Sequence, residues 1–210
     1  MTKPYSGRLC FVRHGQTFAN INKVWHGHTD TALTDEGYNQ TQLLGAYFPQ
    51  YLRADVIYTS PLQRARITAE AIASTFNLSV IHDPRLMELH LGDWEGKTFV
   101  ELTEEGNVVQ QLIDDPHFAA PNGESQDMVR ERIVAAVYEI IAKHPNDNAV
   151  IVAHGVTISI ALAHYLDGDT RLWPKYSKSN TAFTEICLNT KQLISFNLSK
   201  HLEDSSAAQT

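Results

Sequence analysis

The chain has 210 residues, of which 43% are hydrophobic and 20% charged, as is ordinary for a soluble globular protein. This length suits one α/β domain with a substantial core. The formal net charge of −7 argues against a general binder of nucleic acid or anionic membranes, because such proteins need broad basic surfaces. Any anion site must therefore be a local cluster of cations.

Targeting signals are not evident in the sequence. No segment approaches the roughly 18–20 uninterrupted apolar residues that a membrane-spanning helix needs. The residues from Met1 to Arg8 are polar and lack the apolar region of a secretory signal. Cys10 and Cys187 lie in apolar, strand-like runs, which predicts reduced, buried thiols. We therefore expect a cytoplasmic protein with neither a membrane nor nucleic acid among its partners.

The first part of the chain predicts two strands with a helix between them. Leu9–Val12 is a short apolar run typical of a buried strand. Thr34, followed by two acidic residues, is typical of a helix start. This helix is expected to end near Phe48, before Pro49, because proline interrupts a helix. Asp55–Thr59 is the second predicted strand.

Another helix is expected directly after the second strand. Ser60 would cap it, and Pro61 would occupy its first position. Apolar residues at helical spacing form one face of it: Leu62, Ala65, Ala69, Ile72, Ala73 and Phe76. Ser79–His82 is predicted to be a short third strand.

The second half of the chain begins less regularly. A helical insertion is expected within Thr98–Asp115, as part of a lid over about residues 98–123. Ser125 would cap a long helix with an apolar face formed by Val129, Ile133, Val137 and Ile140. Ala149–Ala153 predicts a buried strand, and the almost wholly apolar Val156–Leu166 predicts a buried helix.

The chain closes with two more predicted strands, Phe183–Leu188 and Leu193–Leu198, as edge strands or a hairpin that could also pair with a second copy in a homodimer. Residues from about 203 to 210 are small and polar and are expected to fray. The alternation of strands and helices predicts a three-layer α/β/α fold with a mostly parallel central sheet. We expect a single domain over residues 1–210.

Residues suited to binding a reactive anion follow three of the predicted strands. They are Arg13, His14 and Gly15 after the first strand, Arg64 shortly after the second, and His154 and Gly155 after the strand ending at Ala153. Ligands bind at the carboxyl ends of strands in parallel α/β sheets, so these residues are expected to converge. Arginine, histidine and glycine placed together there indicate a site for an anion that reacts.

An ordered set of motifs resembles the histidine phosphatase superfamily, which includes cofactor-dependent phosphoglycerate mutases and related phosphatases. The resemblance begins with Arg13-His14-Gly15-Gln16-Thr17 and Asn20, and extends over roughly residues 8 to 198. The other matching motifs are Gly27…Asp30…Leu33-Thr34…Gly37, Ser60-Pro61…Arg64-Ala65…Thr68-Ala69, Glu88…Gly92-Asp93-Trp94-Glu95-Gly96, Gly123-Glu124-Ser125 and His154-Gly155. The resemblance implies a phosphoglycerate mutase-like fold and phosphatase activity.

The resemblance also implies a role for each polar residue at the site. His14 would be the nucleophile, forming a phosphohistidine that water then hydrolyses. Arg13 and Arg64 would stabilise charge on the phosphoryl group, with His154 as a third cationic or donating group. The implied substrate-binding residues are Arg13, Gly15, Thr17, Asn20, His26, Gly27, Arg64, His154 and Gly155. Neither a metal nor a cofactor is implied.

Glu88 is the implied proton donor to the leaving group, and would later take a proton from the attacking water. It lies between Met87 and Leu89, in an apolar stretch that would favour a protonated carboxyl. Three other acidic residues nearby are alternatives: Asp93, Glu95 and Glu124.

Several further residues allow two interpretations. Thr17 would contact either the substrate or the backbone of its own loop. His26 stands where many relatives carry glutamine, and with His28 it suggests a metal pair, but the spacing matches no zinc pattern. Four aromatic residues could line the site or pack in the core: Trp25, Trp94, Phe118 and Trp173.

The sequence favours a phosphatase over the alternative, a cofactor-dependent phosphoglycerate mutase. Such mutases carry a longer insertion with basic residues that hold the glycerate carboxylate. Here residues 98–123 contain no lysine or arginine, and their acidic side chains are expected to repel multiply charged small acids. A catalytically inactive relative that binds phosphorylated partners is disfavoured because every implied catalytic residue is present. The expected partner is a small phosphorylated metabolite.

Overall fold

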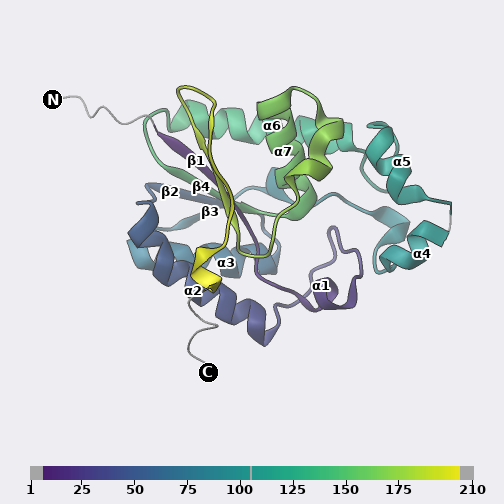
Figure 1. Cartoon of the computed structure of the whole chain (residues 1–210), viewed down its shortest axis with the longest axis horizontal. Coiled ribbons are helices and arrows are strands. Elements are labelled where there is room, and N and C mark those ends of the chain that lie inside the picture. Colours follow the sequence, from purple (N-terminus) through teal and green to yellow (C-terminus); the bar gives the residue numbers. More distant parts are fainter. Residues whose placement is uncertain (1–6, 105, 204–210) are drawn as a thin grey trace.

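The structure is a computed structural model that describes residues 7–104 and 106–203. One sheet of six strands has the order β3-β2-β4-β1-β5-β6 (Figure 1). The strands are β1 (Arg8–Arg13), β2 (Val56–Thr59), β3 (Val80–His82), β4 (Ala149–Ala153), β5 (Phe183–Cys187) and β6 (Leu193–Leu198). Strands β3, β2, β4 and β1 are parallel, whereas β5 and β6 pair antiparallel. The predicted mostly parallel sheet is confirmed.

The central strands contribute to two cores, because successive side chains of a strand point to opposite faces. In β1, Leu9 and Phe11 belong to one core cluster, while Cys10 and Val12 belong to the other. Strand β4 runs beside β1 in parallel register and divides its side chains in the same way. Burial on both faces explains why these strands are apolar throughout instead of alternating.

Long helices cover both faces of the sheet (Figure 1). α6 (Gln126–Lys143) and α7 (Gly155–Asp167) contribute to one core cluster, and α2 (Asp35–Tyr51) and α3 (Gln63–Phe76) to the other. Ser125 caps α6 by accepting a hydrogen bond from the backbone of Met128, as the sequence predicts. The three-layer α/β/α architecture is confirmed.

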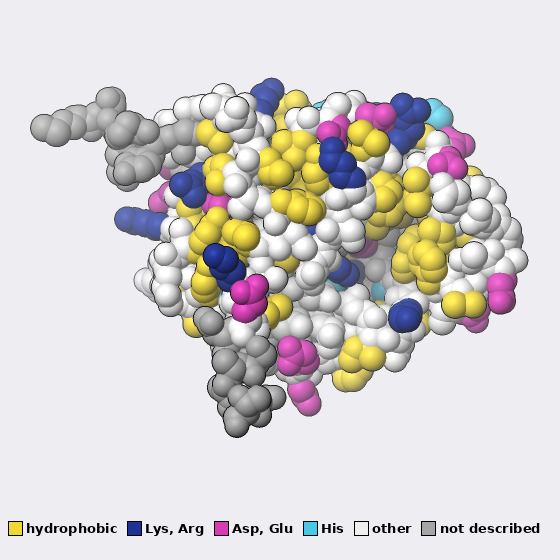
Figure 2. Space-filling model, viewed as in Figure 1, with side chains coloured by type: hydrophobic (Ala, Val, Ile, Leu, Met, Phe, Trp, Pro, Cys, Tyr) yellow, Lys and Arg dark blue, Asp and Glu magenta, His cyan; other side chains and the backbone are white. Residues whose placement is uncertain are grey.

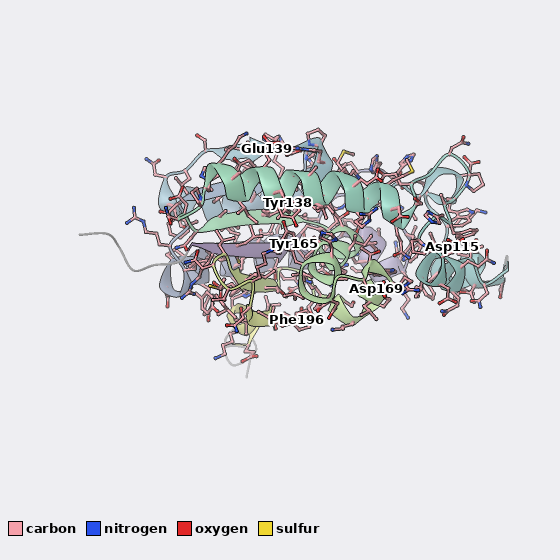
Figure 3. The ribbon with its side chains drawn as sticks, turned by 90° about the horizontal axis from the view of Figure 1, so that it is seen from above. Asp115, Tyr138, Glu139, Tyr165, Asp169 and Phe196 are labelled. Atoms are coloured by element: carbon pink, nitrogen blue, oxygen red, sulfur yellow. The ribbon has the colours of Figure 1, made fainter. Side chains whose placement is uncertain are left out.

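Short helices complete the connections: α1 (Phe18–Asn22), α4 (Phe99–Glu104), α5 (Val108–Asp114), and the 3-10 turns η1 (Pro84–Leu86), η2 (Gly92–Trp94), η3 (Thr170–Tyr176) and η4 (Lys200–Leu202). α4 and α5 are the helices expected within the insertion. Figure 3 shows this insertion, marked by Asp115, at one end of the molecule, past one end of α6. It lies at the same end as α1 in Figure 1.

Helix α3 starts later than expected. It begins at Gln63, and Ser60 and Pro61 lie in the preceding turn, so the predicted Ser60 cap is wrong. The carboxylate of Asp30 accepts a hydrogen bond from the backbone N–H of Gln63 at 2.8 Å. A residue from a distant loop therefore satisfies the helix N-terminus, which no local pattern could indicate.

Helix α2 ends later than expected, because it continues through Pro49 to Tyr51. Proline lacks a backbone donor and so removes one hydrogen bond of the helix, but only two residues follow it before the helix ends. The N–H of Leu52 still donates to the carbonyl of Phe48 at 2.9 Å.

Both cysteines are thiols. Cys10 is buried as predicted, whereas Cys187 is only half-buried, because it lies at the end of β5. Strand β5 is internal to the sheet, so of the two closing strands only β6 is at an edge. Within residues 7–104 and 106–203, no helix is long and apolar enough to cross a membrane. The predicted frayed residues 204–210 lie outside the described residues.

Candidate active site

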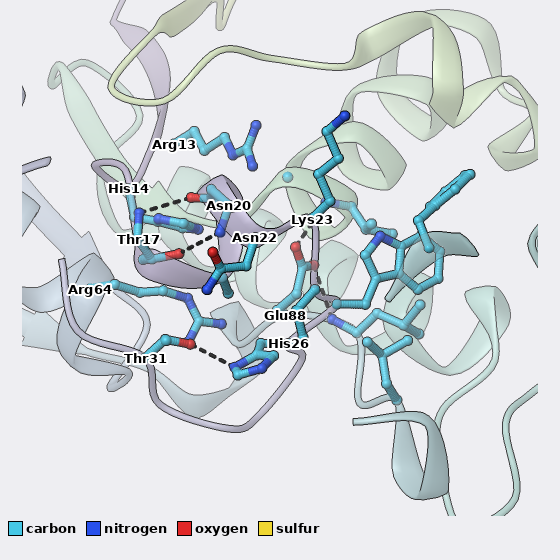
Figure 4. A pocket seen from close by; sticks show the side chains of 18 of the residues that line it. Arg13, His14, Thr17, Asn20, Asn22, Lys23, His26, Thr31, Arg64 and Glu88 are labelled. Carbon is cyan, nitrogen blue, oxygen red and sulfur yellow. Dashed lines mark hydrogen bonds between the residues drawn. The ribbon is translucent and has the colours of Figure 1, made fainter. Parts of the chain in front are cut away.

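The predicted polar residues converge where β1, β2 and β4 end. β1 leads into Arg13 and His14, β4 leads into His154 at the N-terminus of α7, and Arg64 lies in the first turn of α3. The imidazole rings of His14 and His154 have centroids 5.2 Å apart. Figure 4 shows Arg13, His14, Arg64 and Glu88 around one hollow.

His14 is held in one tautomer. Its Nδ1 lies 2.7 Å from the carbonyl oxygen of Gly15. A carbonyl can only accept, so Nδ1 carries the proton and Nε2 keeps its lone pair. Burial, helped by the charges of Arg64 and Arg13, holds the pKa of His14 well below its usual value. The ring is therefore neutral at physiological pH and suited to nucleophilic attack through Nε2.

His154 is arranged to donate a hydrogen bond. Its Nδ1 accepts from Nε of Arg64 at 3.3 Å, which places the proton of the neutral ring on Nε2. That Nε2 is buried and has no hydrogen-bond partner among the described residues. Burial and the charge of Arg64 keep the pKa of His154 well below normal. Of the two roles implied for His154, the structure favours the neutral donor.

The two arginines are anchored by backbone carbonyls. Arg64 donates to the carbonyl of Thr29 at 3.0 Å and to that of Gly27 at 2.7 Å. Arg13 donates through Nη1 to the carbonyl of Lys178, and its Nε is buried without a described partner. Each terminal nitrogen carries two protons, so these bonds fix both guanidinium groups while leaving protons for an anion.

Glu88 faces the same hollow, and its carboxylate lies against the N-terminus of α7. Its carboxylate accepts hydrogen bonds from the backbone N–H groups of Val156 at 3.1 Å and Thr157 at 2.9 Å. The hydroxyl of Thr157 also donates to it at 3.0 Å. The surroundings of Glu88 are thus polar as well as apolar: Leu89 lines the cavity beside it, while its carboxylate lies against the end of a helix.

The alternative acids are engaged elsewhere. Glu95 accepts from the backbone N–H groups of Gly27 and His28, at 3.0 and 2.9 Å. Glu124 accepts from Arg132, and Asp93 accepts from the side chain of Asn122. None of the three lines the cavity, and Glu88 is the only acidic residue among the described residues that do.

Thr17 and Asn20 form a small loop–helix unit beside His14. Thr17 caps α1 by accepting from the N–H of Asn20 at 3.3 Å, while Oδ1 of Asn20 accepts from the N–H of Thr17 at 3.0 Å. Asn180, which the sequence gives no reason to single out, donates to the same Oδ1 at 3.1 Å. The oxygen of Asn20 is thus occupied, and its amide nitrogen remains to donate to a ligand (Figure 4).

The glycines of the predicted site differ in placement. Gly155 lines the cavity, and a Cβ there would lie 3.6 Å from the guanidinium carbon of Arg13. Gly15 and Gly27 do not line it. The N–H of Gly15 donates to the hydroxyl of Thr68, and Gly27 bonds Glu95 and Arg64 through its backbone. Both glycines therefore support the site from behind.

The site opens into a cavity of about 700 Å³. His26 lines it, with Nδ1 2.7 Å from the hydroxyl oxygen of Thr31. Trp25 and Trp173 also line it, whereas Trp94 packs in the core against Phe118 at 5.8 Å between ring centroids. Lining residues that the sequence did not single out include Asn22, Lys23, Val24, Phe99, Val100 and Lys178.

The insertion contributes Thr98, Phe99 and Val100 to the cavity wall. Its described acidic residues do not line the cavity: Glu101, Glu104, Asp114 and Asp115. The insertion therefore contributes the apolar side chains of the first turn of α4 to the cavity wall, and the expected repulsion by its acidic side chains stays a prediction. Glu105 lies outside the described residues.

Residues 7–104 and 106–203 hold no cluster of three or more His, Cys, Asp or Glu side chains that could bind a metal ion. His28, which could have paired with His26, instead places its Nε2 2.9 Å from the carbonyl oxygen of Glu88. Arg13 and Arg64 are the arginines that line the cavity, and Lys23 and Lys178 also line it.

A neutral histidine between two anchored arginines, at the carboxyl edge of an α/β sheet, is an arrangement suited to binding a phosphoryl group. The model of the histidine phosphatase superfamily (branch 1) matches residues 9–198. The chain belongs to this superfamily.

Several similar proteins are named phosphatases. A Bacillus subtilis protein, uncharacterized phosphatase PhoE, is 30% identical over 181 residues, which are 86% of each chain. Phosphoserine phosphatase 1 of Hydrogenobacter thermophilus is 28% identical over 93% of this chain and 94% of its own. A solved phosphoserine phosphatase from Entamoeba histolytica, in complex with 3-phosphoglyceric acid, has a TM-score of 0.84 and 28% identity, covering 93% of this chain and 99% of that one. The protein is a histidine phosphatase.

Proposed function

We propose that this protein hydrolyses phosphomonoesters of small metabolites without a metal, through a phosphohistidine on His14. One observation carries the proposal: the hydrogen bond from Nδ1 to the carbonyl of Gly15 leaves the Nε2 lone pair of a neutral ring available. Arg13 and Arg64 flank this ring, and their charges also keep it neutral.

In the first step, Nε2 of His14 attacks phosphorus and the ester P–O bond breaks. Arg13, Arg64 and the Nε2–H of His154 hold the equatorial oxygens, where negative charge accumulates. Asn20 adds its side-chain amide. Glu88, in its protonated form, gives its proton to the departing alkoxide oxygen, so the products are an alcohol and the phosphohistidine.

In the second step, Glu88 is ionised and takes a proton from a water molecule as the water attacks phosphorus. The N–P bond breaks, inorganic phosphate forms, and His14 returns to its neutral state. The hydrogen bonds from Val156 and Thr157 hold the carboxylate in place for both steps.

Two observations support hydrolysis over the mutase alternative. The named relatives are phosphatases. The insertion that lines the cavity presents Thr98, Phe99 and Val100, none of which could hold a glycerate carboxylate by charge. Conversion of 3- to 2-phosphoglycerate by the purified protein would support the mutase instead.

The covalent intermediate provides the direct test. The enzyme is mixed with p-nitrophenyl phosphate in the presence of a chelator and quenched in alkali, because N–P bonds of phosphohistidine survive base better than acid. Peptide mapping should then find phosphate on His14. His14→Ala should lose at least about 10³-fold in kcat with an unchanged circular-dichroism spectrum. Phosphate on serine or aspartate, or activity abolished by the chelator, would contradict the proposal.

A further inference from the structure

Part of the cavity lining is apolar. This part, here called the outer wall, consists of Val24, Trp25, Phe99, Val100, Val156 and Trp173. In Figure 2, hydrophobic side chains flank the hollow on the side of α4, and basic and histidine side chains are visible in its depth. The outer wall is thus continuous with the site at which the phosphoryl group would bind.

Two residues of this wall are unusually exposed for their type. Phe99 is 44% and Val100 is 62% exposed, both on the first turn of α4. The Phe99 ring stands edge-on to Trp25 with centroids 5.7 Å apart, so the wall has a defined shape. Exposed apolar surface beside a reactive site indicates that the ligand covers it.

The charges around the cavity point the same way. Glu88 is the only acidic residue among its described lining residues, and its oxygens are engaged by the N-terminus of α7. The lysines that line the cavity are Lys23 and the buried Lys178, neither of which could pair with a cation. A substrate ammonium group would find no counter-charge here, and desolvating it would be costly.

We propose, resting on the proposed function, that the enzyme selects phosphomonoesters with an apolar, ring-sized organic group and rejects those with an ammonium group near the ester. The about 700 Å³ cavity is far larger than a phosphoryl group requires, and lies in the range of sites for drug-sized ligands. The organic group packs on the outer wall while Arg13 and Arg64 hold the phosphate. This specificity differs from that of the relatives named for phosphoserine, which carries an ammonium group.

Three esters with the same two-carbon linkage test this directly: ethyl, 2-phenylethyl and 2-aminoethyl phosphate. All are primary-alkyl esters, so the comparison emphasises the distal group over leaving-group chemistry. The value of kcat/KM should be at least about tenfold higher for the phenyl ester than for the ethyl ester, and lowest for the amine. A flat series, or preference for the amine, would overturn the inference.

Variants of the outer wall test whether its residues cause the substrate preference. Phe99→Ala should remove most of the preference for the phenyl ester over ethyl phosphate, measured as the ratio of their kcat/KM values. Tyr138→Ala is the control, because Tyr138 is a comparably exposed aromatic residue (49%) on α6, away from the insertion (Figure 3). An equal loss of the phenyl-ester preference in both variants would contradict a specific role of Phe99.

A charge substitution reverses the expected preference. Val100→Asp supplies the missing carboxylate and should raise kcat/KM for 2-aminoethyl phosphate by about fivefold or more, while lowering it for the phenyl ester. Val100→Asn has the same shape without charge and should show only the second effect. No gain with the aspartate would count against the charge argument.

The test separates this inference from the proposed function. If neither the alkyl esters nor p-nitrophenyl phosphate is hydrolysed, the proposed function fails and the inference with it. If the esters are hydrolysed through His14 but in another order, only the inference fails.

Discussion

The guanidinium group of Arg132 fixes the backbone of Glu88, because its Nη2 donates to the Glu88 carbonyl at 2.9 Å. The same group donates to the carbonyls of Met87 at 2.6 Å and Arg85 at 2.8 Å. Glu124 holds it in turn through two hydrogen bonds of 2.8 Å. Since Arg132 belongs to α6, the loop that carries the proposed proton donor is tied to the scaffold.

We predict that Arg132→Lys impairs leaving-group protonation, because lysine cannot make these forked contacts. Activity on alkyl phosphates should fall by about 10–100-fold, since small misplacements of catalytic groups are costly. Aryl phosphates, which need less protonation, should be affected less. The control is Arg130→Lys on the same helix, where the arginine bonds the half-buried Asp127 of that helix. Equal losses on both substrate types would indicate a general structural defect.

Glu88→Gln should separate the two chemical steps. The amide cannot supply the carboxyl proton, so single-turnover rates should fall by about 10²–10⁴-fold with alkyl phosphates and much less with p-nitrophenyl phosphate. Hydrolysis of the phosphohistidine also needs a base. The variant should therefore release a burst of p-nitrophenolate, followed by slow turnover. A slow first turnover on the aryl ester, with no burst, would argue against Glu88 as acid and base.

The sequence predicts the three layers of the fold and the meeting of His14 and His154 well, because both follow from local patterns. Leu9–Val12 and Ala149–Ala153 are apolar throughout, and each ends at a histidine and a glycine. The carboxyl ends of parallel strands share one edge, so His14 and His154 had to meet.

The remaining features depend on contacts between distant segments. Asp30 caps α3 through Gln63, and Thr157 surrounds Glu88 with donors, although neither is near its partner in sequence. The sequence around Glu88 shows its apolar neighbour Leu89, which lines the cavity with it, but not the donors that a distant helix brings to its carboxylate. The outer wall likewise combines residues from separate segments of the chain. No periodicity in the sequence predicts how those segments lie relative to one another.

The pKa of His14 offers a test of the site's charge. Burial lowers it first, and the cations Arg64 and Arg13 lower it further, because they disfavour a protonated ring. By NMR titration, His14 should stay neutral to well below pH 6.5. Arg64→Met should raise the pKa of His14, since one repelling charge is lost while burial remains. An unchanged or lower pKa in the folded variant would contradict the assigned arrangement.

Lys178 should make stability depend on pH. Burial, with the charge of Arg13, lowers the pKa of Lys178 to about 7, against about 10.4 for an unfolded lysine. Between these values the unfolded chain binds more protons, so the free energy of unfolding should rise as pH increases from 7 toward 10.

Lys178→Met removes this dependence. The variant should exceed the wild type by roughly 1–3 kcal/mol in urea unfolding at pH 7, and the difference should shrink at pH 9. Lys175→Met is the control, because Lys175 is exposed and bonds Asp167 at 2.7 Å, which raises its pKa instead. A constant difference between the Lys178 variant and the wild type at all pH values would reject the lowered pKa.

Gly27 couples packing to the phosphate site. A Cβ at Gly27 would lie 2.0 Å from the carbonyl oxygen of Leu89 and 2.6 Å from Oε1 of Glu95. The backbone at residue 27 would therefore have to shift. Because the carbonyl oxygen of Gly27 accepts a hydrogen bond from Nη2 of Arg64 at 2.7 Å, this shift would also move Arg64. Gly27→Ala should therefore cost about 1–3 kcal/mol of stability and also weaken inhibition by inorganic phosphate.

Gly168→Ala is the matched substitution. Gly168 has φ +71° at the end of α7 with open space around it, so alanine there adds only left-handed strain of about 1–2 kcal/mol. Phosphate inhibition should stay unchanged in that variant although its stability falls by a similar amount. Weaker inhibition in both variants would mean that phosphate binding follows overall stability, whereas a selective loss in Gly27→Ala ties it to the position of Arg64.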